Sequence, residues 1–206
     1  MSKITGPLMS LGASGSVGGT ITFAAWKGRP YARMLVKPAN PKTAAQTAQR
    51  AMMRFLAQAW ATLTTLEKAS WQLLADAGKY SPFNAFVSFN LDRWTQNQAP
   101  TPEPEPGADA SAIPTLVGAT AGVKQVTVEL SMTGANWGAI LYRSTANNFT
   151  PAKTDVIAIR TLANGATIEI TDGNLTTGQT YYYKVAGFAT NGEIVPNANQ
   201  VSATPQ

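Results

Sequence analysis

The sequence of 206 residues contains no cysteine and no histidine. Without cysteine, the chain cannot form a disulfide, a thiolate nucleophile or a cysteine-ligated zinc site. Without histidine, it lacks the commonest general base, the commonest transition-metal ligand and the central residue of a serine–histidine triad. We therefore expect no catalytic, cofactor-binding or metal-binding residues, and a protein that is not an enzyme.

Long apolar runs and organised acidic clusters are also missing. No apolar run approaches the roughly 20 residues needed to span a bilayer, and the N-terminus lacks the apolar core of a signal peptide. We therefore expect synthesis in the cytoplasm and no membrane partner. Asp109, Asp155, Asp172 and Glu193 lack the regular spacing of a calcium loop. The glycine-rich stretch 12–19 lacks the lysine that completes a phosphate-binding loop.

The charge is unevenly distributed along the chain. Residues 1–98 carry eleven Lys and Arg against three Asp and Glu, whereas residues 99–206 carry five against eight. Between the halves, residues 99–107 alternate proline with polar residues, a composition that favours an extended, semi-rigid spacer. We therefore predict two domains, residues 1–98 and 111–206, joined by a proline-rich linker at 99–110.

The first half begins with a glycine-rich arm at 12–19, in which regular packing is not expected. Two β-prone runs follow, Thr20–Trp26 and Tyr31–Lys37, around a turn that contains Gly28. This pattern predicts a β-hairpin. An isolated two-stranded hairpin is only marginally stable in water, so this one requires a partner surface.

Apolar residues at helical spacing then predict three helices. The first is expected to be capped by Asn40 with Pro41 at its first position. A Thr64-x-x-Glu67 capping box opens the second, for which Gly78 suits the C-terminal cap. Ser81-Pro82 opens the third. On the second helix, the predicted apolar stripe is Leu66, Ala69, Leu73, Leu74 and Ala77. Trp71 falls off this stripe, and we expect it to be an exposed aromatic anchor.

The second half changes from helical spacing to alternation of apolar and polar residues. Val126, Val128 and Leu130 alternate with polar residues, as in a half-buried strand. Further strands are expected at 138–143, 156–161, 167–171, 180–188 and 200–204. Short strands at this spacing, separated by glycine- and asparagine-containing turns, predict an antiparallel β-sandwich. The expected fold class is thus multidomain α+β: a β-hairpin with three helices, a linker and a sandwich.

Two segments of the second half resemble the fibronectin type III family. Leu175 lies six residues before Tyr181, which opens a strand, as in that family's tyrosine corner. The run 141–144 followed by Phe149-Thr150 is similar to the family's third strand and the segment after it. The resemblance implies a sandwich over residues 113–206 in which the Tyr181 hydroxyl bonds to the preceding loop.

The first half resembles a small module found in bacteriophage and prophage genomes. The matching features are the glycine-rich stretch at 12–19, the Trp-Lys-Gly-Arg turn from Trp26, a Val-Lys-Pro-Ala-Asn-Pro segment from Val36 and a Leu-Thr-x-x-Glu-Lys-x-x-Trp helix from Leu63. The resemblance implies a virion component, and phage structural proteins are frequent carriers of appended fibronectin-like domains.

Basic and aromatic residues of the first half form the candidate docking interface: Trp26, Lys27, Arg29, Tyr31, Arg33, Lys37, Arg50, Arg54 and Trp71. Three interpretations are open. Arginine side chains can pair with carboxylates of an acidic neighbouring protein, which we favour. The cations can simply be solvated while the aromatics pack internally. Interleaved cations and aromatics can also bind nucleic acid.

These observations lead to one functional expectation. We expect a bacteriophage virion structural protein, most simply a capsid decoration or accessory protein that docks through residues 1–98 and displays the sandwich. The expected partners are the major capsid protein or other virion subunits, with multiple copies per particle and host-surface or environmental glycans at the sandwich. A tail or neck protein, or a basic nucleic-acid-binding protein with an appended sandwich, is the alternative.

Overall fold

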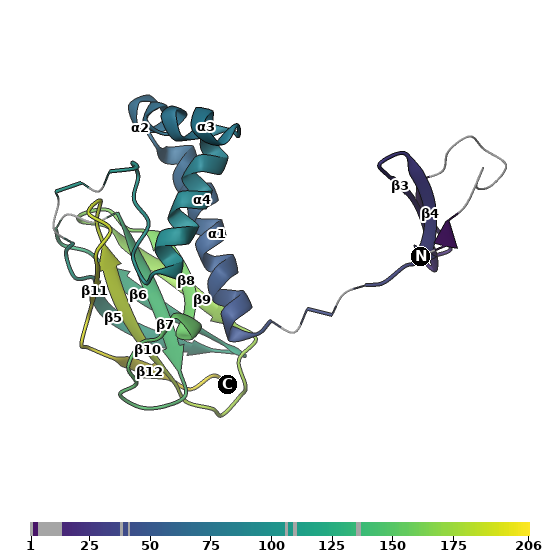
Figure 1. The fold of residues 1–206 in the computed structure, drawn as a ribbon. Coiled ribbons are helices and arrows are strands. Elements are labelled where there is room, and N and C mark those ends of the chain that lie inside the picture. Colours follow the sequence, from purple (N-terminus) through teal and green to yellow (C-terminus); the bar gives the residue numbers. More distant parts are fainter. Residues whose placement is uncertain are drawn as a thin grey trace. The chain divides into compact units, whose positions relative to one another are not determined.

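The computed structural model describes residues 2–3, 14–37, 39–40, 42–105, 107–108, 111–134 and 137–206. The chain divides into two compact units, Met1–Pro41 and Lys42–Gln206 (Figure 1). The predicted division at 99–110 is therefore misplaced, because the helices belong to the same unit as the sandwich. We call these two parts the N-terminal unit and the C-terminal unit.

The N-terminal unit contains a four-stranded antiparallel sheet in the order β1-β4-β3-β2. Its strands are β1 (Ser2–Lys3), β2 (Gly15–Val17), β3 (Ile21–Trp26) and β4 (Arg29–Met34). The predicted hairpin is confirmed: β3 and β4 are joined by Lys27 and Gly28, whose φ angles of 48° and 73° suit the tight turn that matches strand twist. Part of the glycine-rich arm is regular after all, since β2 pairs with β3. Residues 12 and 13 lie outside the described residues.

The helical segments of the C-terminal unit are α1 (Ala44–Thr62), α2 (Thr65–Ser70), α3 (Gln72–Gly78) and α4 (Pro82–Thr95). The side chain of Thr43 caps α1, so the prediction of Asn40 as the cap is wrong, and Pro41 lies outside the described residues. The capping box between Thr64 and Glu67 is confirmed. The second predicted helix is broken into two, and Lys79 rather than Gly78 adopts the left-handed conformation after it, with φ 56°.

The sandwich consists of two antiparallel sheets, in the orders β5-β6-β9 and β11-β10-β7-β8, with β12 also paired to β10. The bounds are β5 (Thr115–Gly122), β6 (Gln125–Ser131), β7 (Gly138–Ser144), β8 (Val156–Thr161), β9 (Thr167–Gly173), β10 (Tyr181–Phe188), β11 (Ile194–Pro196) and β12 (Val201–Ala203). All the predicted strands are present, and β5 and β11 are additional. A short 3-10 turn, η2 (Lys153–Asp155), precedes β8.

The expected tyrosine corner is also present. The backbone N–H of Thr176 donates to the hydroxyl oxygen of Tyr181 at 3.1 Å, and Leu175 is buried beside it. The strand order and this corner together make the sandwich fibronectin type III-like.

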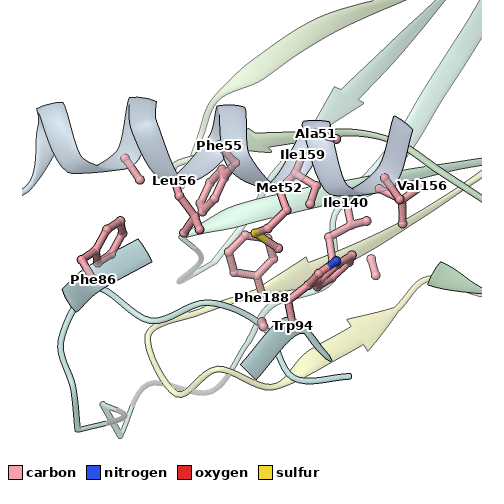
Figure 2. Packing of buried hydrophobic residues seen from close by; sticks show 14 of the residues in the cluster. Ala51, Met52, Phe55, Leu56, Phe86, Trp94, Ile140, Val156, Ile159 and Phe188 are labelled. Carbon is pink, nitrogen blue, oxygen red and sulfur yellow. The ribbon is translucent and has the colours of Figure 1, made fainter. Parts of the chain in front are cut away.

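A second apolar core lies on the outer face of the larger sheet, where α1 and α4 cover it (Figure 1). Strand β7 shows the reason, because successive side chains of a strand point to opposite faces. Leu141 is buried between the two sheets, while Ile140 is buried against the helices with Phe55 and Phe188 (Figure 2). The C-terminal unit therefore has three layers: helices, the β7-containing sheet and the β5-β6-β9 sheet.

The proline-rich segment is not a free spacer, which corrects the second part of the predicted domain organisation. Residues 99–102 are all buried, and the side chain of Asn90 bonds both to the N–H of Thr101 (2.7 Å) and to its carbonyl (3.1 Å). The N–H of Ala99 donates to the carbonyl of Gly192 at 3.0 Å. The segment is thereby held between α4 and the sandwich. Within the described ranges, no helix is both long and apolar enough to cross a membrane.

Candidate docking surface

The two faces of the N-terminal sheet differ sharply in chemistry. Directly paired residues of antiparallel strands project to the same face, and the register pairs Ile21 with Met34, Phe23 with Ala32 and Ala25 with Pro30. Val17 joins this face through its pairing with Ile21. We call this set the apolar face: Val17, Ile21, Phe23, Ala25, Pro30, Ala32 and Met34.

The opposite face carries cations and aromatic rings. Here Thr22 pairs with Arg33, Ala24 with Tyr31 and Trp26 with Arg29. We call this set the cationic face: Thr22, Ala24, Trp26, Arg29, Tyr31 and Arg33. The ammonium of Lys27, in the adjoining turn, lies 4.8 Å from the centroid of the Trp26 ring, and Trp26 is 66% exposed. Exposed arginines beside aromatic rings suit a partner that presents carboxylates or phosphates.

The sheet has no hydrophobic core of its own, since every side chain described between residues 14 and 37 is exposed or half-buried. Met34 of the apolar face is 78% exposed and Val17 is 52% exposed. A sheet must bury its apolar face against another layer to be stable. The described side chains of the N-terminal sheet therefore leave its apolar face uncovered within the unit, and the need of the hairpin for a partner surface stays a prediction.

The N-terminal unit also carries all of the net charge of the chain. Residues 1–41 contain five Lys and Arg and no Asp or Glu, whereas residues 42–206 contain eleven of each sign. The formal net charge of +5 is thus located in the N-terminal unit, and the C-terminal unit is neutral. The C-terminal unit is neutral because residues 42–98 carry six basic against three acidic side chains, whereas residues 99–206 carry five against eight.

The nine predicted docking residues are divided between the two units. Trp26, Arg29, Tyr31 and Arg33 share the cationic face, with Lys27 in the turn beside it. The exposed Lys37 follows β4. The remaining cations, Arg50 and Arg54, are exposed on α1 in the other unit. The positive charge of Arg54 adds to burial in lowering the pKa of Arg160, which places Arg54 beside β8.

Trp71 is not an exposed anchor, and this prediction is wrong. It is fully buried, its ring lies 5.3 Å from that of Phe86, and its Nε1 donates to the carbonyl of Pro102 at 2.8 Å. The helix breaks at this residue, so the apolar stripe predicted for one continuous helix is not maintained. Leu66 and Leu73 of that stripe are instead 79% and 80% exposed.

The apolar face of the N-terminal sheet was not predicted from the sequence. Its signal was the alternation on both strands, with Ile21, Phe23 and Ala25 on one and Pro30, Ala32 and Met34 on the other. Among the residues that the structure describes, no three acidic side chains gather where they could hold a metal ion. With one apolar and one cationic face, the N-terminal sheet is suited to binding through charge and apolar contact.

No protein-family model and no curated protein sequence matches the chain. Among solved structures, a β-1,2-glucanase from Parabacteroides distasonis matches 49% of this chain and 13% of its own, at 22% identity and a TM-score of 0.39. An Fn3-like protein from Clostridium thermocellum matches 47% of this chain and 95% of its own, at 22% identity and a TM-score of 0.36. A pectate lyase from Pectobacterium carotovorum matches 45% and 27%, at 19% identity and a TM-score of 0.35. The chain thus spans only a small part of the two enzymes that it resembles.

Proposed function

We propose that the protein is a structural subunit of a bacteriophage virion, an accessory or decoration protein that attaches to the capsid through its N-terminal sheet. The observation that carries this proposal is a sheet whose described side chains, residues 14–37, form no buried core, in a unit that holds the entire net charge of the chain. Such a sheet is suited to becoming ordered against a neighbouring subunit. The resemblance of residues 11–94 to a phage-encoded module supplies the identity of the assembly.

The cationic face is the part that meets the partner subunit. Arg29 and Arg33 can form two-pronged hydrogen bonds with carboxylates, and the exposed Trp26 adds a large apolar contact of the kind that dominates binding energy at interfaces. The partner surface is therefore acidic. The neutral C-terminal unit is displayed on the particle, where the outer face of the β5-β6-β9 sheet is available for weak contacts with glycans.

A nucleic-acid-binding role is the second candidate, because the same face combines cations with exposed aromatic rings and residues 1–41 contain no acidic side chain. A tail or neck location is the alternative position within the particle. Docking on a protein subunit and binding to nucleic acid differ in their salt dependence. Each phosphate contact releases counterions, so the affinity for nucleic acid falls steeply with added salt.

Co-sedimentation with capsid shells that lack the protein tests the proposal, with duplex DNA titrated in parallel. We expect saturable shell binding that Arg29→Glu/Arg33→Glu weakens at least tenfold. The matched control is Arg50→Glu/Arg54→Glu, which makes the same charge change on α1 and should leave shell binding intact.

Two results would contradict the proposal. If the α1 variant abolishes shell binding while the N-terminal variant retains it, docking occurs through the C-terminal unit. If shells are not bound while duplex DNA is bound tightly at low salt and released at high salt, the nucleic-acid role is correct.

A further inference from the structure

The cationic face accounts for only one side of the N-terminal sheet. We propose that the apolar face pairs with the same face of a second copy of the chain, so that two sheets form a small two-fold β-sandwich. This inference concerns the purified protein and does not depend on attachment to a virion.

The composition of the two faces indicates that the partner of the apolar face is a second copy of the chain. All seven side chains of the apolar face are uncharged and apolar, so this face is complementary to itself, as a two-fold interface requires. The cationic face is not, because Arg29 and Arg33 of two copies would repel each other. An acidic partner is equally unsuited to the apolar face, since carboxylates would lose water there without gaining hydrogen bonds.

The sheet geometry permits this pairing. Two sheets pack face to face at about 10 Å, with side chains of the inner faces interdigitating. On the apolar face, the large side chain of Phe23 lies beside Ala32, its cross-strand partner, with Ala25 two residues further along β3. Large and small side chains next to each other allow a facing copy to interdigitate. In the dimer both cationic faces point outward, and one dimer therefore offers two docking surfaces.

The expected dimer is weak. The apolar face contributes seven side chains per copy, whereas stable interfaces use about 20–30 residues a side. We therefore expect dissociation in the micromolar range or above for the free protein. On a particle with many copies, tethering raises the effective concentration and favours the paired state.

Sedimentation velocity over a concentration series of the full chain tests the pairing. We expect a reversible monomer–dimer equilibrium that Met34→Lys weakens at least tenfold, because it places a charge in the interface. Met34 is 78% exposed, so the substitution removes little contact within the sheet. The matched control is Leu66→Lys, since Leu66 is 79% exposed on the C-terminal unit and its replacement should leave the equilibrium unchanged.

The absence of cysteine permits a second test that does not depend on weakening the sheet. Ala32→Cys places a single thiol on the apolar face. Ser16→Cys places one on the opposite face, since Ser16 pairs with Thr22. A short bis-maleimide should cross-link the first variant into dimers and leave the second monomeric.

A wild-type chain that stays monomeric up to about 0.5 mM overturns the proposal, because that limit excludes even a weak dimer. Equal cross-linking of the two cysteine variants also overturns it, as does loss of the dimer in Leu66→Lys but not in Met34→Lys. A failed shell-binding experiment would leave these results unaffected, since shell docking is assigned to the other face.

Discussion

Asn90 links α4 to the proline-rich segment that follows it. Its side-chain amide is fully buried and donates to the carbonyls of Phe86 and Thr101, both at 3.1 Å, while its oxygen accepts from the N–H of Thr101 at 2.7 Å. In the described structure, Asn90 is the side chain that bonds to both the N–H and the carbonyl of Thr101. Asn90 therefore satisfies backbone groups that burial would otherwise leave without partners.

We expect Asn90→Ala to lower the free energy of unfolding by about 2–4 kcal/mol, because both polar backbone groups of Thr101 would be buried and unsatisfied. Urea denaturation measures the change. Asn84→Ala is the control on the same helix, since Asn84 is exposed and should cost less than about 0.5 kcal/mol. Equal effects of the two substitutions would contradict the assigned role of Asn90.

Two buried tyrosines predict a loss of stability in strong alkali. Burial, assisted by the negative charge of Asp155, raises the pKa of Tyr142 to about 12. Burial and Asp172, which accepts a hydrogen bond from the Tyr183 hydroxyl at 2.9 Å, raise the pKa of Tyr183 in the same direction. Unfolded tyrosines ionise near pH 10. Above that pH the unfolded state loses protons that the folded state retains, so the free energy of unfolding falls as pH rises.

The expected fall between pH 10 and pH 12 is about 1.4 kcal/mol per pH unit for each tyrosine, with no such contribution below pH 9. Tyrosinate absorbance should show Tyr142 and Tyr183 ionising only late or on unfolding, and Tyr142→Phe should remove one of these late ionisations. Ionisation of Tyr142 and Tyr183 near pH 10 in the folded protein, seen as the absence of a late phase that Tyr142→Phe reduces, would contradict this prediction.

Helix α1 packs as part of the sandwich. Phe55 is fully buried and lies close to Phe188 (Figure 2). The centroid of its ring lies 5.2 Å from that of Trp137 and 5.4 Å from that of Phe188. We expect Phe55→Ala to cost about 3–5 kcal/mol, measured by urea unfolding. The urea-unfolding transition of the helices and that of the β-sheets should shift together. Gln58→Ala, on the exposed side of α1, should have little effect. An unchanged β transition in Phe55→Ala would show that helices and sandwich unfold separately.

The division at 41/42 decides which fragments of the chain can fold. A fragment of residues 42–206 keeps the shared core of helices and sheet, and we expect it to unfold in one transition. A fragment of residues 111–206 would expose the outer sheet face that includes Ile140, Val156 and Phe188. We expect that fragment to aggregate and to bind a hydrophobic dye, measured by size-exclusion chromatography and dye fluorescence. A soluble, dye-negative sandwich would contradict the three-layer description.

The sequence was sufficient to predict most elements but not their partners. Alternation identified the strands, and the Thr64–Glu67 capping box correctly located a helix start. The prolines of 99–107 suggested a spacer because local composition does not report Asn90, which lies nine residues before the segment and holds it. Trp71 was misassigned because periodicity presupposes an unbroken helix. The uninterrupted apolar run of β7 is typical of a strand that is buried on both faces. This run could have predicted that a second layer covers the outer face of its sheet.

The order of elements along the chain has a consequence for biosynthesis. Helix α1 ends at Thr62, whereas β10, which contributes Phe188 to the same core, ends at Phe188. At about 5–20 residues per second, roughly 6–25 s separate their emergence from the ribosome. During that interval the sheet that the apolar side of α1 covers is incomplete, because β7 and β8 emerge before β10. The yield of folded protein should therefore depend on translation speed and on chaperones. This dependence should be stronger than for a sandwich whose layers are synthesised close together in time.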